Sequence, residues 1–147
     1  MKTYSFLGSL FLFLSLSAAT YAASCPPSPT LTELVSSSTH VFVAQVASAT
    51  LSADRKWIDA TFHVEEALKG DPVKVPSVRA TFTETNFDLP QDVYMSGGDL
   101  LISPGMHFLV FASEDGPVLY GLCTRTQVLR KRDDVLLRSI RSFVLQR

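Results

Sequence analysis

The sequence predicts a mainly β fold, a five-stranded Greek-key barrel with a short N-terminal helix and a C-terminal amphipathic helix. Three observations lead to this fold class. Five β-rich runs are separated by turn residues, a long polar connection precedes the fourth run, and apolar residues at helical spacing end the chain. A β-sandwich is the structural alternative.

The first 22 residues are predicted to be a secretory signal peptide. Lys2 supplies a basic start, residues 6–16 form an apolar run (FLGSLFLFLSL), and Thr20 and Ala22 are small residues before the expected cleavage site. The run is well short of the roughly 20 residues that span a bilayer. We therefore expect a secreted product, extracellular or periplasmic, without a membrane-spanning segment.

Residues 23–147 are expected to form a single domain and a monomer. Loss of Lys2 leaves 12 basic residues against 14 acidic ones, a net charge of −2, so we expect no nucleic acid as partner. The two cysteines of an exported chain, Cys25 and Cys123, are predicted to form one disulfide. The alternative is a lipidated cysteine, because residues 22–25 (AASC) faintly resemble a bacterial lipoprotein box.

The first elements are predicted from capping residues and alternation. Ser28 and Pro29 suit the cap and first turn of a helix over residues 30–37. Residues 41–51 (VFVAQVASATL) are β-rich and apolar, typical of a strand buried on much of both faces. Residues 57–68 alternate, with Ile58, Ala60, Phe62 and Val64 on the core side and Asp59, Thr61, His63 and Glu65 on the other.

The later elements are predicted from turns and helical spacing. Residues 73–83 form the third strand, with Pro76 marking an edge or bulge, and residues 84–105 form a long polar connection. Residues 106–112 and 118–123 are the fourth and fifth strands, joined as a hairpin. A final helix follows Asp133 and Asp134, and five strands fit the OB-fold. The apolar face of that helix is predicted to hold Leu136, Leu137, Ile140, Phe143 and Val144.

Five short segments occur in a recognisable order. They are residues 25–27 (CPP), 38–46 (STHVFVAQV), 62–70 (FHVEEALKG), 104–112 (PGMHFLVFA) and 122–126 (LCTRT). Together they resemble the netrin-like OB-fold superfamily, and within it the inhibitory domain of the tissue inhibitors of metalloproteinases. The resemblance covers about residues 23–128.

The resemblance implies a metalloprotease inhibitor that acts through its mature N-terminal edge. In that family a Cys-x-Cys start places the amine and carbonyl of its first residue on the open position of the protease zinc. Here Ala23 stands at the first position, Ser24 at the residue aimed into the specificity pocket, and Cys25 at the second cysteine, whose bridge matches Cys25–Cys123. The family's first cysteine and its loop partner are absent, so we expect weakened inhibition.

The carboxyl-terminal segment suggests a second partner. Residues 125–147 carry seven basic residues against two acidic ones. The plain interpretation is a solvated helix face, and the sharper one is contact with a sulfated polysaccharide or an anionic matrix. The predicted contact residues are Arg130, Lys131, Arg132, Arg138 and Arg141.

The sequence shows no catalytic constellation, so we expect a non-catalytic binding protein. His40, His63 and His107 occur singly and lack the spacing of metal ligands. Glu65 and Glu66 are neighbours on a predicted strand and would point to opposite faces. We predict no catalytic residue, no bound metal and no cofactor.

Overall fold

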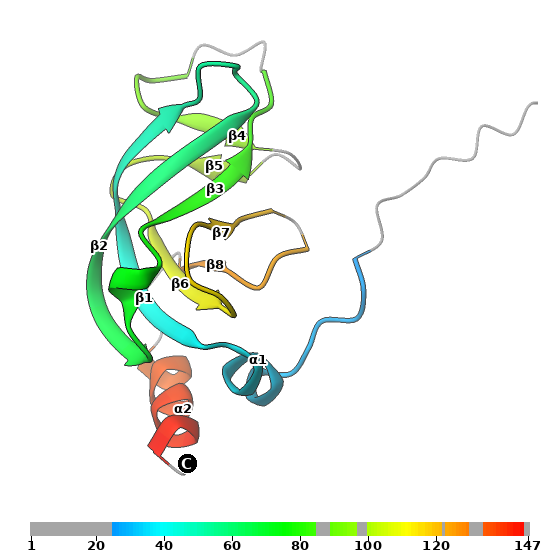
Figure 1. The fold of residues 1–147 in the computed structure, drawn as a ribbon, viewed down its shortest axis with the longest axis vertical. Coiled ribbons are helices and arrows are strands. Elements are labelled where there is room, and N and C mark those ends of the chain that lie inside the picture. Colours follow the sequence, from blue (N-terminus) through cyan, green and yellow to red (C-terminus); the bar gives the residue numbers. More distant parts are fainter. Residues whose placement is uncertain (1–24, 85–88, 97–99, 122, 130–133, 146–147) are drawn as a thin grey trace, which may run out of the picture.

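A computed structural model describes residues 25–84, 89–96, 100–121, 123–129 and 134–145. These residues form a curled six-stranded sheet, shaped as a half-barrel, with a two-stranded sheet at one end and two helices at the other (Figure 1). The predicted mainly β class is confirmed. The predicted signal peptide lies outside the described residues.

Two long strands form the centre of the large sheet. β1 (His40–Leu51) and β2 (Trp57–Lys69) are an antiparallel hairpin joined by residues 52–56, which confirms the first two predicted strands. Their register shifts between residues 41 and 42, 43 and 44, and 46 and 48 of β1. Because such irregularities increase the local twist, they account for the curl of this hairpin.

The remaining strands extend the hairpin on both sides. β3 (Ser77–Thr81) is antiparallel to β2, and β6 (His107–Ala112) is antiparallel to β1. The edges are β7 (Val118–Leu119), parallel to β3, and β8 (Gln127–Leu129), antiparallel to β6. The complete order of the sheet is β7-β3-β2-β1-β6-β8.

The predicted count of five strands is not confirmed, because the described residues hold eight. The predicted connection 84–105 contains β4 (Tyr94–Ser96) and β5 (Leu100–Ile102), which pair with each other. Strands of three residues are too short to produce a readable periodicity. β8 lies beyond the last predicted strand.

The predicted hairpin between the fourth and fifth strands is wrong. The turn after β6 is held by a hydrogen bond from the Gly116 N–H to the Lys74 carbonyl, 2.7 Å long. Lys74 belongs to a short 3-10 turn, η1 (Pro72–Lys74), that precedes β3. This bond directs the chain after β6 toward β3. β7 therefore pairs with β3 in parallel and does not fold back on β6.

The sheet buries apolar side chains on both of its sides. Inside the half-barrel, Phe108 is fully buried, with its ring centroid 4.9 Å from that of Tyr120 and 6.3 Å from that of Phe62. On the other side, the helices cover a second cluster. Its buried members are Leu34, Val35, Val41, Val43, Leu109, Phe111, Leu137 and Ile140.

The two helices close one end of the molecule (Figure 1). α1 (Leu31–Ser37) begins at Thr30, whose Oγ1 accepts the Glu33 N–H while the Glu33 carboxylate accepts the Thr30 N–H. This capping box places the cap two residues after the predicted Ser28. α2 (Asp134–Leu145) buries Leu137 and Ile140, which confirms its predicted apolar face. None of the described helices has the length and apolar character to cross a membrane.

Candidate functional site

The predicted protease-facing edge is described from Cys25 onward, whereas Ala23 and Ser24 lie outside the described residues. We call residues 23–30 the leading edge. Cys25 is bonded to Cys123, with Cα atoms 5.3 Å apart, as predicted. Residues 25–30 are exposed and contain three prolines, whose rings restrict the backbone. The described part of the edge is therefore held by the disulfide at one end and by α1 at the other.

A hollow of about 100 Å³ lies beside the leading edge. Its lining includes Cys25, Pro26, Leu34 and Arg125. The Arg125 guanidinium donates to the hydroxyls of Ser37 at 3.0 Å and Ser113 at 3.4 Å, which joins this loop to α1 and to the end of β6. The hollow suits water or the tip of a partner's side chain rather than a whole ligand.

The predicted anionic-ligand patch is only partly brought together in the described residues. Residues 130–132 lie outside them. Arg138 is exposed on α2, but the Arg141 guanidinium binds the Glu66 carboxylate of β2 at 2.6 and 2.8 Å. Arg141 therefore links α2 to β2, and the Glu66 carboxylate already neutralises its positive charge.

The three histidines occupy separate places. His40 is 3 % exposed, its Nδ1 accepts the Asp71 N–H at 3.0 Å, and its Nε2 lies 2.9 Å from the Asp115 carboxylate. Since Nδ1 is an acceptor, the ring proton is on Nε2, and this N–H donates a hydrogen bond to the Asp115 carboxylate. His107 Nε2 lies 3.0 Å from the Glu65 carboxylate. Among the described residues, no three His, Cys, Asp or Glu side chains form a group that could hold a metal.

Asp115 should make the folded state more sensitive to acid. The hydrogen bond from His40, followed by the charge of Lys74, lowers the pKa of the Asp115 carboxyl below its ordinary 3.8. Its stabilising contribution is therefore present above that value and is lost as the pH falls through the lower folded-state pKa. We expect Asp115→Asn to flatten the acid side of the stability curve, measured by urea unfolding from pH 6 to pH 2.

The neighbouring carboxylate supplies a matched control for this measurement. Glu114 lies exposed in the same turn, and Glu114→Gln should leave the acid slope as in the unmodified protein. Parallel loss of stability in the Asp115→Asn variant and the unmodified protein would contradict the assigned role of Asp115.

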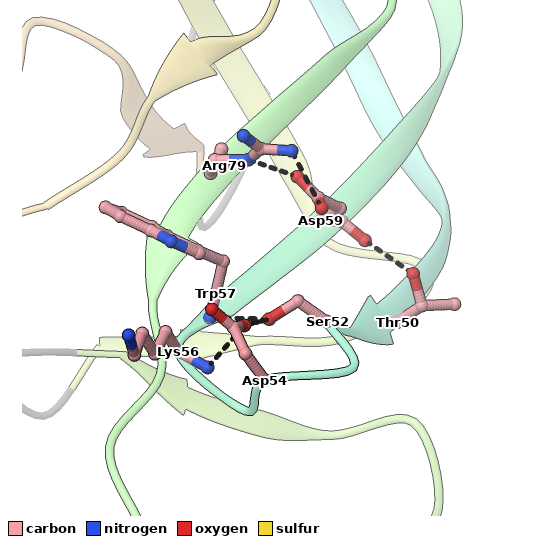
Figure 2. Close-up of polar contacts among 7 residues, drawn as sticks. All are labelled: Thr50, Ser52, Asp54, Lys56, Trp57, Asp59 and Arg79. Atoms are coloured by element: carbon pink, nitrogen blue, oxygen red, sulfur yellow. Dashed lines mark hydrogen bonds and ion pairs between the residues drawn. The ribbon is translucent and has the colours of Figure 1, made fainter.

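One further surface was not singled out from the sequence. Trp57 begins β2, and the alternation of that strand places it on the same side as Asp59 and Thr61. Figure 2 shows Trp57 next to an ion pair in which Arg79 Nε and Nη2 lie 2.7 and 3.1 Å from the two Asp59 oxygens. The signal was present in the sequence, because an alternating strand that starts at residue 57 turns its tryptophan to the polar side.

The turn before β2 fixes where this tryptophan lies. The Ser52 hydroxyl donates to the Asp54 carboxylate at 2.6 Å and accepts the Trp57 N–H at 3.0 Å. Asp54 also accepts the Lys56 N–H at 3.2 Å (Figure 2). These bonds lock the hairpin turn and fix the backbone of Trp57, from which the indole extends.

The comparisons with known proteins assign no family. A scan against protein-family models found no match, and a search of the curated proteins found no match either. The likeness to netrin-like domains therefore stays a prediction that rests on the short segments quoted above.

Proposed function

We propose that this protein is a secreted, non-catalytic binding domain that inhibits a zinc metalloprotease through its leading edge. The observation that carries the proposal is the Cys25–Cys123 bond, which holds an exposed, proline-rich segment against the loop that precedes β8. A segment held in place before it binds loses less conformational freedom on contact with a partner.

The order of the strands supports the same proposal. The sheet order β6-β1-β2-β3 and the parallel return of β7 to β3 fit a Greek-key barrel such as the OB-fold. Cys25, near the start of the predicted mature chain, lies against the loop that precedes β8. The disulfide joins these two regions across a sequence separation of 98 residues.

The proposed chemistry uses backbone atoms. A protease zinc keeps one coordination position open, and the free α-amino group and carbonyl oxygen of Ala23 would fill it in place of water. Ala23 and Ser24 precede the disulfide, so ordering them costs about 1–2 kcal/mol per residue. We therefore expect inhibition weaker than that of an edge anchored at both positions.

The test is to titrate a panel of zinc metalloproteases with protein that begins at Ala23. We expect inhibition of at least one protease, and its loss when one alanine is added before Ala23, because the amine then moves off the metal. The same alanine added after Arg147 is the matched control and should change nothing. Absence of inhibition across the panel, or inhibition that survives the N-terminal addition, would refute the mechanism.

A sulfated polysaccharide is the second candidate partner. It is favoured by the exposed Arg138 on α2 and by the excess of basic residues in the carboxyl-terminal segment. The ion pair between Arg141 and Glu66 removes one of the five predicted contacts from this account. We therefore rank this partner below the protease.

A further inference from the structure

One solvent-exposed region of the large sheet contains Trp57 and several polar side chains. We define the Trp57 face by Ser48, Thr50, Trp57, Asp59, Thr61 and Arg79. The strand registers pair Ser48 with Thr61, Thr50 with Asp59, and Asp59 with Arg79, so these side chains lie on one side of β1, β2 and β3. On the same side of the sheet, α1 and α2 cover the region around Val41, Val43 and Leu109.

The Trp57 face is open to solvent in the described structure. Ser48, Thr50 and Thr61 are exposed, and the side chains of Asp59 and Arg79 are 31 % and 42 % exposed. The Trp57 side chain is partly exposed, and in the view of Figure 2 its ring lies between Arg79 and Lys56. On this open face an aromatic ring offers a stacking surface, and the neighbouring polar groups offer hydrogen bonds.

We propose that the Trp57 face binds an uncharged carbohydrate. An indole ring offers a flat apolar surface on which the C–H side of a sugar ring can lie. Beside it, the Asp59–Arg79 pair leaves carboxylate lone pairs and guanidinium N–H groups for neighbouring sugar hydroxyls, which both donate and accept. The hydroxyls of Ser48 and Thr61, 2.7 Å apart, extend the same polar surface.

Charge decides between a neutral sugar and an ionic ligand. The opposite charges of Asp59 and Arg79 are already paired at 2.7 Å, and the turn beside Trp57 adds one further charge of each sign, Asp54 and Lys56, which attract each other. An anion would meet the Asp59 carboxylate, and a cation would meet the Arg79 guanidinium. A polyhydroxyl ligand without charge can bond to both groups without separating them.

The Trp57 face is independent of the proposed protease contact. The leading edge connects through α1 to the first residue of β1, whereas Trp57 follows the turn after the last residue of β1. Cys25 of the leading edge is bonded to Cys123, and the lining of the hollow beside that edge includes no residue of the Trp57 face. Failure of either proposal leaves the other standing.

The test uses the chain's single tryptophan as its own reporter. The mature protein is titrated with cellohexaose, chitohexaose and mannohexaose, and binding is followed by tryptophan emission and by calorimetry. We expect a saturable emission change with at least one of these neutral oligosaccharides. Its affinity should not change between 50 and 500 mM salt, because no net charge is neutralised on binding.

Variants separate the Trp57 face from other surfaces. By calorimetry we expect Trp57→Ala to abolish binding, Trp57→Phe to retain part of it, and Asp59→Asn to weaken it at least tenfold. His63→Ala, on the same side of β2 but further along the strand, is the matched control and should bind as the unmodified protein. Circular dichroism checks that each variant is folded.

Three results would overturn the proposal. The first is that none of the three oligosaccharides binds by either method. The second is that a folded Trp57→Phe or Asp59→Asn variant binds as tightly as the unmodified protein. The third is that binding occurs only to heparin, weakens with salt and is unaffected by changes at Trp57, which would assign glycan binding to the basic carboxyl-terminal segment instead.

Discussion

Replacing Cys25 and Cys123 together with serine is expected to lower the free energy of unfolding by about 2–5 kcal/mol. The bridged residues are 98 apart in sequence, so reduction releases a long loop in the unfolded chain. In the chain-entropy account the bond acts mainly by restricting that unfolded chain. The measurement is urea unfolding of both proteins, followed by circular dichroism.

The sheet itself should survive this change, because its hydrogen-bonded strands do not depend on the bond. A Cys25→Ser and Cys123→Ser variant with the far-ultraviolet spectrum of the unmodified protein but a lower unfolding midpoint is the expected outcome. The unmodified protein under reducing conditions is the matched control and should behave like the variant. A variant with an unchanged midpoint would show that the bond contributes nothing to stability.

Gly70→Ala is expected to destabilise the protein by about 2–4 kcal/mol. Gly70 follows β2 with a φ of +70°, a conformation that side chains disfavour. A Cβ atom there would lie 2.3 Å from the Thr39 carbonyl oxygen and 2.7 Å from His40 Nδ1. The Thr39 carbonyl is the backbone group immediately before β1 and His40 is the buried first residue of that strand, so the added methyl group must push the turn away from the sheet. The loss is measured by chemical unfolding.

Gly105 is the matched control for this prediction. It also has a positive φ, +87°, but a Cβ atom built on it meets nothing within 4 Å. Gly105→Ala should therefore lower the free energy of unfolding by roughly 1–2 kcal/mol, the cost of placing alanine in a left-handed backbone conformation. Equal losses for the two substitutions would mean that crowding around Gly70 contributes nothing.

The elements that were predicted well are those with long, regular patterns. The first two strands and the terminal helix were located to within a residue or two, because alternation and helical spacing are repeated several times along each. The disulfide was predicted from the expected compartment and the presence of two cysteines. Each of these inferences needs only local pattern or simple chemistry.

The elements that were missed depend on partners far away in sequence. β4 and β5 have three residues each and exist because they pair with each other. β7 has two residues, and it lies beside β3 because the turn before it bonds to Lys74. Such short segments carry no period, so only the assembled sheet determines their structure.

The candidate sites show the same division. The sequence identified the leading edge and the basic segment from residue types, and the structure describes Cys25, Arg138 and Arg141 among them. Arg141 forms an ion pair with Glu66, which is 75 positions away in sequence. The spacing of charges along the chain could not predict this pair. The bond forms because α2 packs across the end of β2.

By itself the sequence determined the mainly β class, the long central strands, the amphipathic helix and the cysteine pair. These follow from side-chain periodicity and from the chemistry of thiols, which act over a few residues or need no geometry. Only the tertiary structure decided which polar groups meet. It joined Arg79 to Asp59 beside Trp57 and Arg141 to Glu66 beneath the helix, because strand register and helix packing bring distant residues within bonding distance.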